Sequence, residues 1–238
     1  MIKFLPHKTK ILFLDLEYYV PENDRDNPNP GGMSFSPTSP THKVIGGCFQ
    51  IYYPMKNRPE CQILSFWEWK LGSEENIIKE IYKVFISLWK GIHKSNNCVP
   101  MCCGIIGISH SDLPVLYTKM LQYKLDTPEN LFYLIFGTRQ LDLSCIVAGQ
   151  FTSKKHNYFF YPKTKSQLYQ KYLPKAKRSE HAISVWKYYD DRAFEEIEQR
   201  TRLEIIDSLK IYKKFFEKRM ETENILNNAK KQLKTNNQ

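Results

Sequence analysis

Residues 10–17 have the sequence KILFLDLE, an apolar run that ends in two carboxylates, Asp15 and Glu17. The run is short and almost uninterrupted, which predicts a buried strand whose carboxyl end opens at a site. Because side chains alternate along a strand, Asp15 and Glu17 project to one side and Leu16 to the other. Two carboxylates so placed can share a divalent cation. Taken alone, the pattern fits two solvated residues at a strand exit better.

The rest of the chain alternates between strand-like and helix-like periodicity. Residues 21–41 are rich in Pro, Gly, Asn and Ser, which predicts a long loop insertion. Further strands are predicted at residues 42–52, 62–69 and 99–109, with a short strand or helix start at 139–147. Helices are predicted at residues 73–92, with Ser73 as N-cap, at 112–122 and 166–173, and from 191 or 194 to 216 or beyond. This order predicts an α/β fold with one mixed five-strand sheet and flanking helices.

Length and composition favour a single domain. The chain has 238 residues, of which 42% are hydrophobic, enough for one well-buried α/β core. It contains no run of roughly 20 apolar residues, the length that spans a bilayer. Its first ten residues also lack the apolar core of a secretory signal, so we expect a soluble, cytoplasmic protein with no membrane contact. The six cysteines form no C-x-x-C pair, which favours reduced core residues over zinc ligands.

The net charge of +10 is concentrated after residue 150. Residues 151–179 hold eight Lys or Arg, no Asp or Glu, and seven aromatics, a mixture that suits single-stranded nucleic acid. The cations expected to hold phosphates are Lys154, Lys155, Lys163 and Lys165, and the rings expected to stack on bases are Tyr158 and Phe159. A solvated lysine-rich surface over a partly buried aromatic patch explains the segment equally well.

Two later stretches add carboxylates. Asp112 stands at the predicted strand-to-helix junction, just before Leu113 and Pro114, where a simple helix N-cap is the plainer interpretation. In the last predicted helix, Glu204 is followed one turn later by Ser208, a small residue that leaves room for a metal ion and a phosphate. Asp207 is the rival acid, but the residue one turn beyond it is the bulky Ile211.

Taken in order, these three motifs resemble those of the DEDD 3′–5′ exonucleases, which have a ribonuclease H-like fold. The resemblance covers residues 10–216. The late motif is similar to that of predicted exonucleases related to the proofreading domain of family B DNA polymerases: an acid, a hydrophobic pair, a small hydroxyl residue and a Tyr before a basic-Phe end. Glu204, Ser208, Tyr212 and Phe215 match this outline.

The resemblance implies an exonuclease domain at residues 1–216, followed by a polar, basic tail at residues 217–238 that is a candidate contact for protein partners. It implies hydrolysis of phosphodiester bonds at the 3′ end of single-stranded nucleic acid, with DNA favoured over RNA. It also implies two Mg²⁺ or Mn²⁺ ions. The carboxylates that would hold these ions are Asp15, Glu17, Asp112 and Glu204.

Two positions depart from the family pattern. The last acid is usually Asp, and here it is Glu204; the Tyr four residues or His five residues before it is replaced by Arg200 and Gln199. Neither replacement is a normal general base. Three explanations stay open: a base from elsewhere, activation of water by metal alone, or a module that binds nucleic acid without cutting. The candidate bases from elsewhere are His110, His181, Tyr188 and Tyr189.

Overall fold

A computed structural model describes residues 2–5, 7–25, 34–54, 62–92, 97–151, 162–175 and 183–235; the side chains of residues 183, 184 and 217–235 lie outside the description. Its strands are β1 (Ile11–Tyr19), β2 (Lys43–Tyr52), β3 (Leu64–Trp67), β4 (Met101–Gly104) and β5 (Arg139–Asp142). They form one sheet in the order β3-β2-β1-β4-β5. The β1–β2 and β2–β3 pairs are antiparallel, whereas β1–β4 and β4–β5 are parallel. The predicted α/β fold with a mixed five-strand sheet and flanking helices is confirmed.

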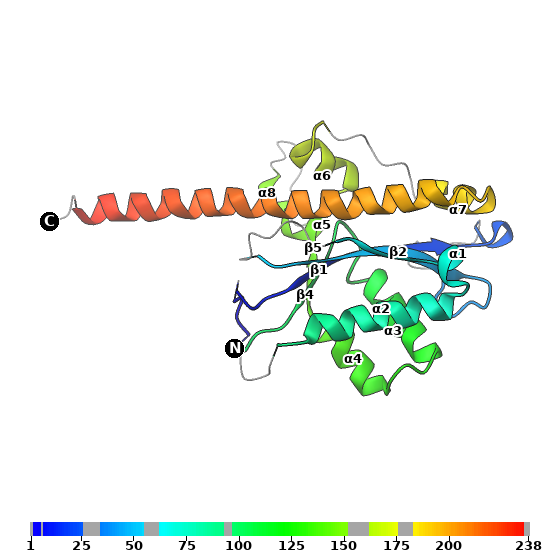
Figure 1. The fold of residues 1–238 in the computed structure, drawn as a ribbon. Helices are drawn as coiled ribbons and strands as arrows, with labels where there is room; N and C mark the ends of the chain where they lie inside the picture. Colours follow the sequence, from blue (N-terminus) through cyan, green and yellow to red (C-terminus); the bar gives the residue numbers. More distant parts are fainter. Residues whose placement is uncertain are drawn as a thin grey trace.

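Helices cover both faces of the sheet (Figure 1). One face carries α2 (Glu74–Trp89), α3 (Asp112–Gln122) and α4 (Pro128–Phe136). The other carries α5 (Leu143–Ile146), α6 (Lys165–Tyr172), α7 (Ile183–Asp190) and α8 (Phe194–Thr235), and the C-terminal part of α8 continues past the sheet. The Ser73 hydroxyl accepts a hydrogen bond from the Asn76 backbone N–H, so the predicted N-cap of α2 is confirmed.

The alternation of β1 decides where its carboxylates lie. Leu12, Leu14 and Leu16 belong to the core beneath α2, α3 and α4, whereas Ile11 and Phe13 belong to the core shared with α8. Asp15 and Glu17 continue the row of Ile11 and Phe13, since side chains two positions apart face the same way. The two carboxylates are therefore directed toward the face that α8 covers.

Several predicted boundaries were wrong because turns interrupt the apolar runs. The strand predicted at 62–69 ends at Trp67, and α1 (Glu68–Leu71) follows, closed by Gly72 at φ +82°. The strand predicted at 99–109 ends at Gly104, because Gly107 at φ +82° turns the chain toward α3. Other boundaries agree with the prediction: residues 139–147 hold both a strand, β5, and a helix, α5, and α8 continues beyond residue 216, to Thr235. The sequence also gave no indication of α7.

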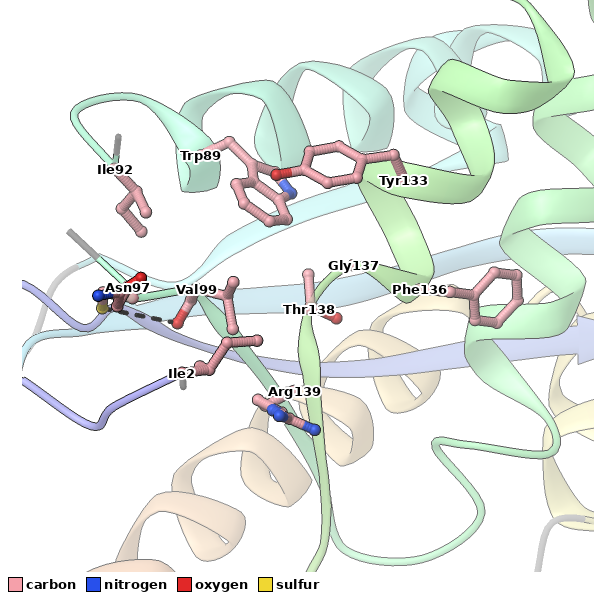
Figure 2. Close-up of a pocket in the computed structure, with 11 residues that line it drawn as sticks. Ile2, Trp89, Ile92, Asn97, Val99, Tyr133, Phe136, Gly137, Thr138 and Arg139 are labelled. Carbon is pink, nitrogen blue, oxygen red and sulfur yellow. Dashed lines mark hydrogen bonds between the residues drawn. The ribbon is translucent and has the colours of Figure 1, made fainter. Parts of the chain in front are cut away.

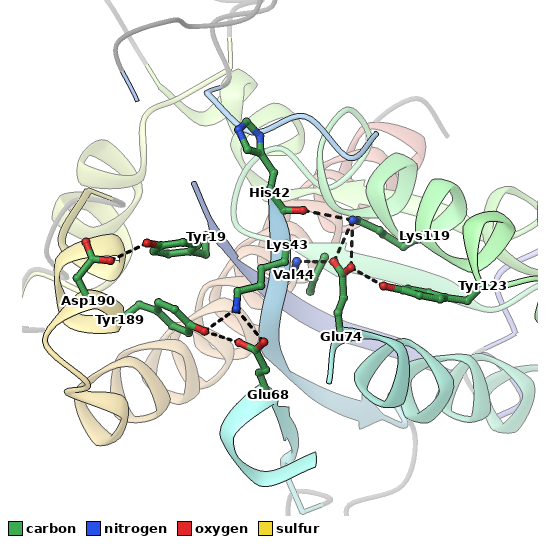
Figure 3. Close-up of polar contacts among 10 residues, drawn as sticks. All are labelled: Tyr19, His42, Lys43, Val44, Glu68, Glu74, Lys119, Tyr123, Tyr189 and Asp190. Carbon is green, nitrogen blue, oxygen red and sulfur yellow. Dashed lines mark hydrogen bonds and ion pairs between the residues drawn. The ribbon is translucent and has the colours of Figure 1, made fainter. Parts of the chain in front are cut away.

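A buried polar network fixes the start of β2 to the helices (Figure 3). The Lys119 ammonium lies 3.1 Å from the Glu74 carboxylate, which also accepts hydrogen bonds from the Val44 backbone N–H and the Tyr123 hydroxyl. Lys119 is 1% exposed, so its charge is stable there only because Glu74 neutralises it. The network ties α2 and α3 to the sheet.

None of the helices in the described ranges has the length and apolar character that crossing a membrane requires.

Candidate active site

Four carboxylates from three distant parts of the chain act on one another electrostatically: Asp15 and Glu17 at the carboxyl end of β1, Asp112 at the start of α3, and Glu204 in the first third of α8. Burial raises the pKa of the Asp15 carboxyl well above its usual range, and the nearby charges of Glu204, Glu17 and Asp112 raise it further. Glu17, Asp112 and Glu204 are themselves buried. The structure thus brings together the four acids that the sequence singled out. We call Asp15, Glu17, Asp112 and Glu204 the carboxylate cluster.

Two cations from the chain pair with the α8 side of the carboxylate cluster. The Arg200 guanidinium donates a 2.7 Å hydrogen bond from Nη1 to Glu17 Oε1, and its Nη2 lies 3.1 Å from Glu204 Oε1. Arg200 can bridge the two acids because it precedes Glu204 by four residues, one turn of helix. The Lys165 ammonium, at the start of α6, contacts Glu204 Oε2. The sequence analysis assigned neither cation to this place.

Glu17 is held from two directions. Besides Arg200, the Thr201 hydroxyl donates a 2.8 Å hydrogen bond to Glu17 Oε1. Burial raises the pKa of the Glu17 carboxyl to about 7, and the Arg200 charge only partly opposes this rise. Glu17 is therefore fixed in position, and burial makes its carboxyl keep a proton to higher pH than an exposed glutamate does.

Asp112 is placed by the turn that precedes α3. Its carboxylate accepts a 2.6 Å hydrogen bond from the Tyr18 hydroxyl, and burial raises its pKa to about 7. The turn is fastened by Asp142 at the end of β5, which accepts hydrogen bonds from the Gly107 backbone N–H at 2.7 Å and from the Ser144 hydroxyl at 2.5 Å. The sequence analysis missed Asp142. The available signal was its place at the carboxyl end of a strand parallel to β4.

Two oxygen sites in the carboxylate cluster lack a complete set of partners. No described residue donates a hydrogen bond to the Asp15 side chain or forms an ion pair with it, although the carboxyl is partly exposed. Glu204 Oε1 is buried and makes no hydrogen bond, because the Arg200 contact at 3.1 Å is an ion pair without hydrogen-bond geometry. Unsatisfied buried carboxylate oxygens are costly unless a cation reaches them.

The donor set fits Mg²⁺ or Mn²⁺, since hard divalent cations prefer carboxylate oxygens. The thiol beside the carboxylate cluster is that of Cys48, which pairs with Asp15 across β1 and β2, and burial raises its pKa, which disfavours the thiolate that a metal ion would bind. Across the described ranges, however, no three Asp, Glu, His or Cys side chains converge as ligands around one ion. The reason is local: Glu17 and Glu204 are directed at Arg200 and Lys165.

The structure separates Glu204 from its rival, Asp207. The Glu204 charge acts on Asp15, Glu17 and Asp112, whereas Asp207 is not among the main charges acting on those three groups. Asp207 instead lies 3.3 Å from the Lys210 ammonium, and its charge helps to raise the pKa of the Tyr169 hydroxyl, on α6. Asp207 is therefore at the edge of the site, beside a Tyr that the sequence analysis did not consider.

The basic aromatic segment lies only partly within the described ranges. Lys154, Lys155, Tyr158 and Phe159 are outside them. Lys163 is only 9% exposed and lies 5.6 Å from the centre of the Phe151 ring. Lys165 contacts Glu204, so neither lysine is fully open to solvent, and their role in holding phosphates stays a prediction. Their ammonium groups are drawn into the fold by aromatic and carboxylate partners.

Of the candidate bases that the structure describes, Tyr189 forms hydrogen bonds with residues outside the carboxylate cluster. The Tyr189 hydroxyl donates to Glu68 and accepts from Lys43, at the start of β2, which pairs with the carboxyl end of β1 (Figure 3). His181 lies outside the described ranges, and neither His110 nor Tyr188 is among the main groups that act on Asp15, Glu17 or Asp112. The hydroxyl that the structure does bring to the edge of the site is that of Tyr169.

A separate cavity of about 440 Å³ lies at the opposite end of β4 and β5 (Figure 2). Its walls include Trp89, Tyr133 and Arg139, and no carboxylate lines it. The chemistry of the carboxylate cluster is therefore independent of this cavity.

Comparison with protein-family models finds no match to the chain, and comparison with curated proteins finds no similar sequence. The geometry of the site therefore carries the functional argument.

Proposed function

We propose that this chain is a divalent-cation-dependent 3′–5′ exonuclease with a ribonuclease H-like fold. The observation that carries the proposal is the convergence of the four carboxylates from β1, α3 and α8, one of which, Asp15, has no partner among the described residues. The sheet supports the fold, because three antiparallel strands are followed by two parallel ones in the order β3-β2-β1-β4-β5.

The carboxylate cluster would hold the catalytic cation. When bound, such an ion lowers the pKa of a water molecule and stabilises the charge on the leaving 3′ oxygen. The protein supplies the positions: Tyr18 orients Asp112, Thr201 orients Glu17, and Asp142 fastens the turn that carries Asp112. These contacts hold the ligands before substrate arrives, which is how a preorganised site lowers the barrier to reaction.

Single-stranded DNA is the proposed substrate, on the resemblance to polymerase-related exonucleases and on the excess of basic residues after residue 150. Lys154 and Lys155 are the proposed phosphate contacts, with Tyr158 and Phe159 as the stacking platform. Lys165 is a quarter exposed at the rim of the site, so its charge faces both Glu204 and the solvent from which a phosphate would approach.

One observation favours a second candidate function, a module that binds nucleic acid without cutting it. Arg200 replaces the Tyr expected four residues before the last acid and ties Glu17 to Glu204. Acids that are already paired with cationic side chains of the protein attract a metal ion less strongly. The same cations would still attract a phosphate backbone.

A labelled oligonucleotide separates the two functions. Single-stranded DNA labelled at its 5′ end should be shortened stepwise in Mg²⁺ and stay intact in EDTA, whereas a 3′ label should be released as mononucleotide. Asp15→Asn is the matched control, because it keeps the shape of the side chain and removes its charge. Binding without shortening in Mg²⁺ and in Mn²⁺ would establish the second function, and equal cleavage by Asp15→Asn would refute the assigned site.

A further inference from the structure

The two sides of the carboxylate cluster differ in what neutralises them. Glu17 and Glu204, on the side of α8, are paired with Arg200 and Lys165, while Asp15 and Asp112 form no ion pair with a described residue. We infer that the site takes up one divalent cation rather than two, with Asp15 and Asp112 as its ligands and with Arg200 and Lys165 in the place of the second ion. The inference rests on the proposed function.

The paired side is a built arrangement. Arg200 has a side-chain exposure of 12%, and its contacts reach both Glu17 and Glu204. Lys165 is held over Glu204 by a helix start with a full capping box, in which the Thr164 hydroxyl and the Gln167 side chain satisfy each other's backbone N–H groups. Both cations are therefore anchored by their own helices, so expelling them would break contacts across the fold.

The open side offers two carboxylates that form no ion pair with a described residue; the Lys165 charge also acts on Asp15, but its ammonium contacts Glu204. Asp15 has no partner among the described residues, and only one oxygen of Asp112 receives a hydrogen bond there, from the Tyr18 hydroxyl. Tyr18 is neutral and donates its proton, so it orients the carboxylate without cancelling its charge. Asp15 and Asp112 keep the oxygens that a hard cation requires.

The charges balance with a single ion. When ionised, the four carboxylates carry four negative charges, and Arg200 and Lys165 cancel half of them. One divalent cation cancels the rest. A second would leave a buried site with a net charge of +2 among the described groups, which is costly in a medium that solvates charge poorly. Arg200 and Lys165 together carry the same positive charge as the second divalent ion would.

Mn²⁺ binding to the full chain tests the inference without any measurement of activity. Titration calorimetry should give one Mn²⁺ per chain, and the bound ion should show an uncoupled electron paramagnetic resonance spectrum. Two ions about 3.5 to 4 Å apart would instead give a coupled spectrum. A stoichiometry of two with a coupled spectrum would overturn the inference and leave the proposed nuclease intact. No binding at millimolar Mn²⁺ would overturn the metal-dependent function itself.

Removing the two cations should create the second binding site. In the double variant Arg200→Gln, Lys165→Gln, we expect the stoichiometry to rise from one to two, because Glu17 and Glu204 become available. Arg202→Gln, which removes an exposed cation two positions away on α8, is the matched control and should still bind one. A folded double variant that still binds a single ion would contradict the role assigned to the two cations. If the double variant fails to fold, Lys165→Gln alone applies the same test, with a measurable gain in total Mn²⁺ bound expected.

Discussion

The Arg200 guanidinium on α8 donates a 2.7 Å hydrogen bond to the Glu17 carboxylate on β1, joining residues 183 positions apart. The contact fastens the helix that carries Glu204 to the strand that carries Asp15. It also places a permanent positive charge inside a group of acids, since a guanidinium does not lose its proton in proteins. Stability and activity at this site are therefore coupled, and the predictions below separate them.

Loss of Asp15 or Asp112 should abolish cleavage without unfolding the protein. We expect Asp15→Ala to keep or raise the free energy of unfolding, by on the order of 1 kcal/mol, because the carboxyl is crowded by like charges and has no partner among the described residues. Asp112→Ala should give a slightly lower free energy of unfolding than Asp15→Ala, since it also leaves the Tyr18 hydroxyl without its acceptor. Urea denaturation and a Mg²⁺ cleavage assay check the two effects. Near wild-type cleavage by both variants would show that the site is wrongly assigned.

Glu204 and Asp207 should differ sharply in activity. Glu204→Gln keeps the shape of the side chain but removes a charge from the carboxylate cluster, so we expect activity to fall by at least about a hundredfold. Asp207→Asn should lower the cleavage activity much less, because Asp207 lies near Tyr169 and Lys210 instead. The measurement is a side-by-side Mg²⁺ titration of cleavage rate. The opposite ranking would make Asp207 the fourth ligand.

Arg200 should stabilise the fold more than any exposed cation on the same helix. Arg200→Gln leaves Glu17 and Glu204 buried without their shared partner, and breaking a buried pair in this way costs about 3 to 5 kcal/mol. Lys210→Gln is the matched control: Lys210 also pairs with an acid on α8, but its side chain is 54% exposed, so the cost should stay below about 1 kcal/mol. Equal losses in urea denaturation in EDTA would contradict the bridging role.

The stability of the protein in EDTA should fall as pH rises from about 5 to about 8. Burial raises the pKa of both the Glu17 and Asp112 carboxyls to about 7, so the folded state binds these protons more tightly than the unfolded chain does. Folding is therefore favoured below the unfolded-state pKa of about 4, and the advantage is lost as pH rises through the folded value, by a few kcal/mol at most.

Asp112→Asn tests this pH dependence directly, because an amide does not titrate. Urea denaturation of the variant at a series of pH values should give a flatter profile than that of the wild type. Added Mg²⁺ should also flatten the wild-type profile, since a bound cation favours the ionised carboxylates. A stability that increases steadily over this pH range in EDTA would be the opposite of what the raised pKa values require.

The lysines of the basic aromatic segment should fall into two classes. Replacing Lys154 and Lys155 by Gln should reduce the slope of log affinity against log salt by about 1.4, the value for two lost phosphate contacts on a single strand, and leave cleavage at saturating substrate unchanged. Lys165→Gln should act mainly on cleavage and metal binding, because Lys165 contacts Glu204. Fluorescence anisotropy with a labelled oligonucleotide at several salt concentrations gives the slopes. An unchanged slope in the first variant would show that those two lysines do not meet the strand.

The sequence alone determined those features that depend on neighbours within a few residues. The alternation in 10–17 places Asp15 and Glu17 on one side of β1, and the Ser73 cap and the start of α3 at Asp112 follow from the same local chemistry. Local patterns were less reliable where a turn cuts an apolar run, as at Gly107 after β4. A left-handed glycine there depends on its bond to Asp142, which lies 35 residues away.

Tertiary structure decided what each acid faces. Helical periodicity leaves Glu204 and Asp207 as neighbours on one side of α8, and only the packing of α8 over β1 brings the charge of Glu204 near Asp15 and Asp112. The same packing takes Arg200 and Lys165, which composition alone would assign to the solvent, into the carboxylate cluster. The physical reason is that a charge is stable inside a protein only beside an opposite charge, and residues 183 positions apart can become such neighbours only when the whole chain has folded.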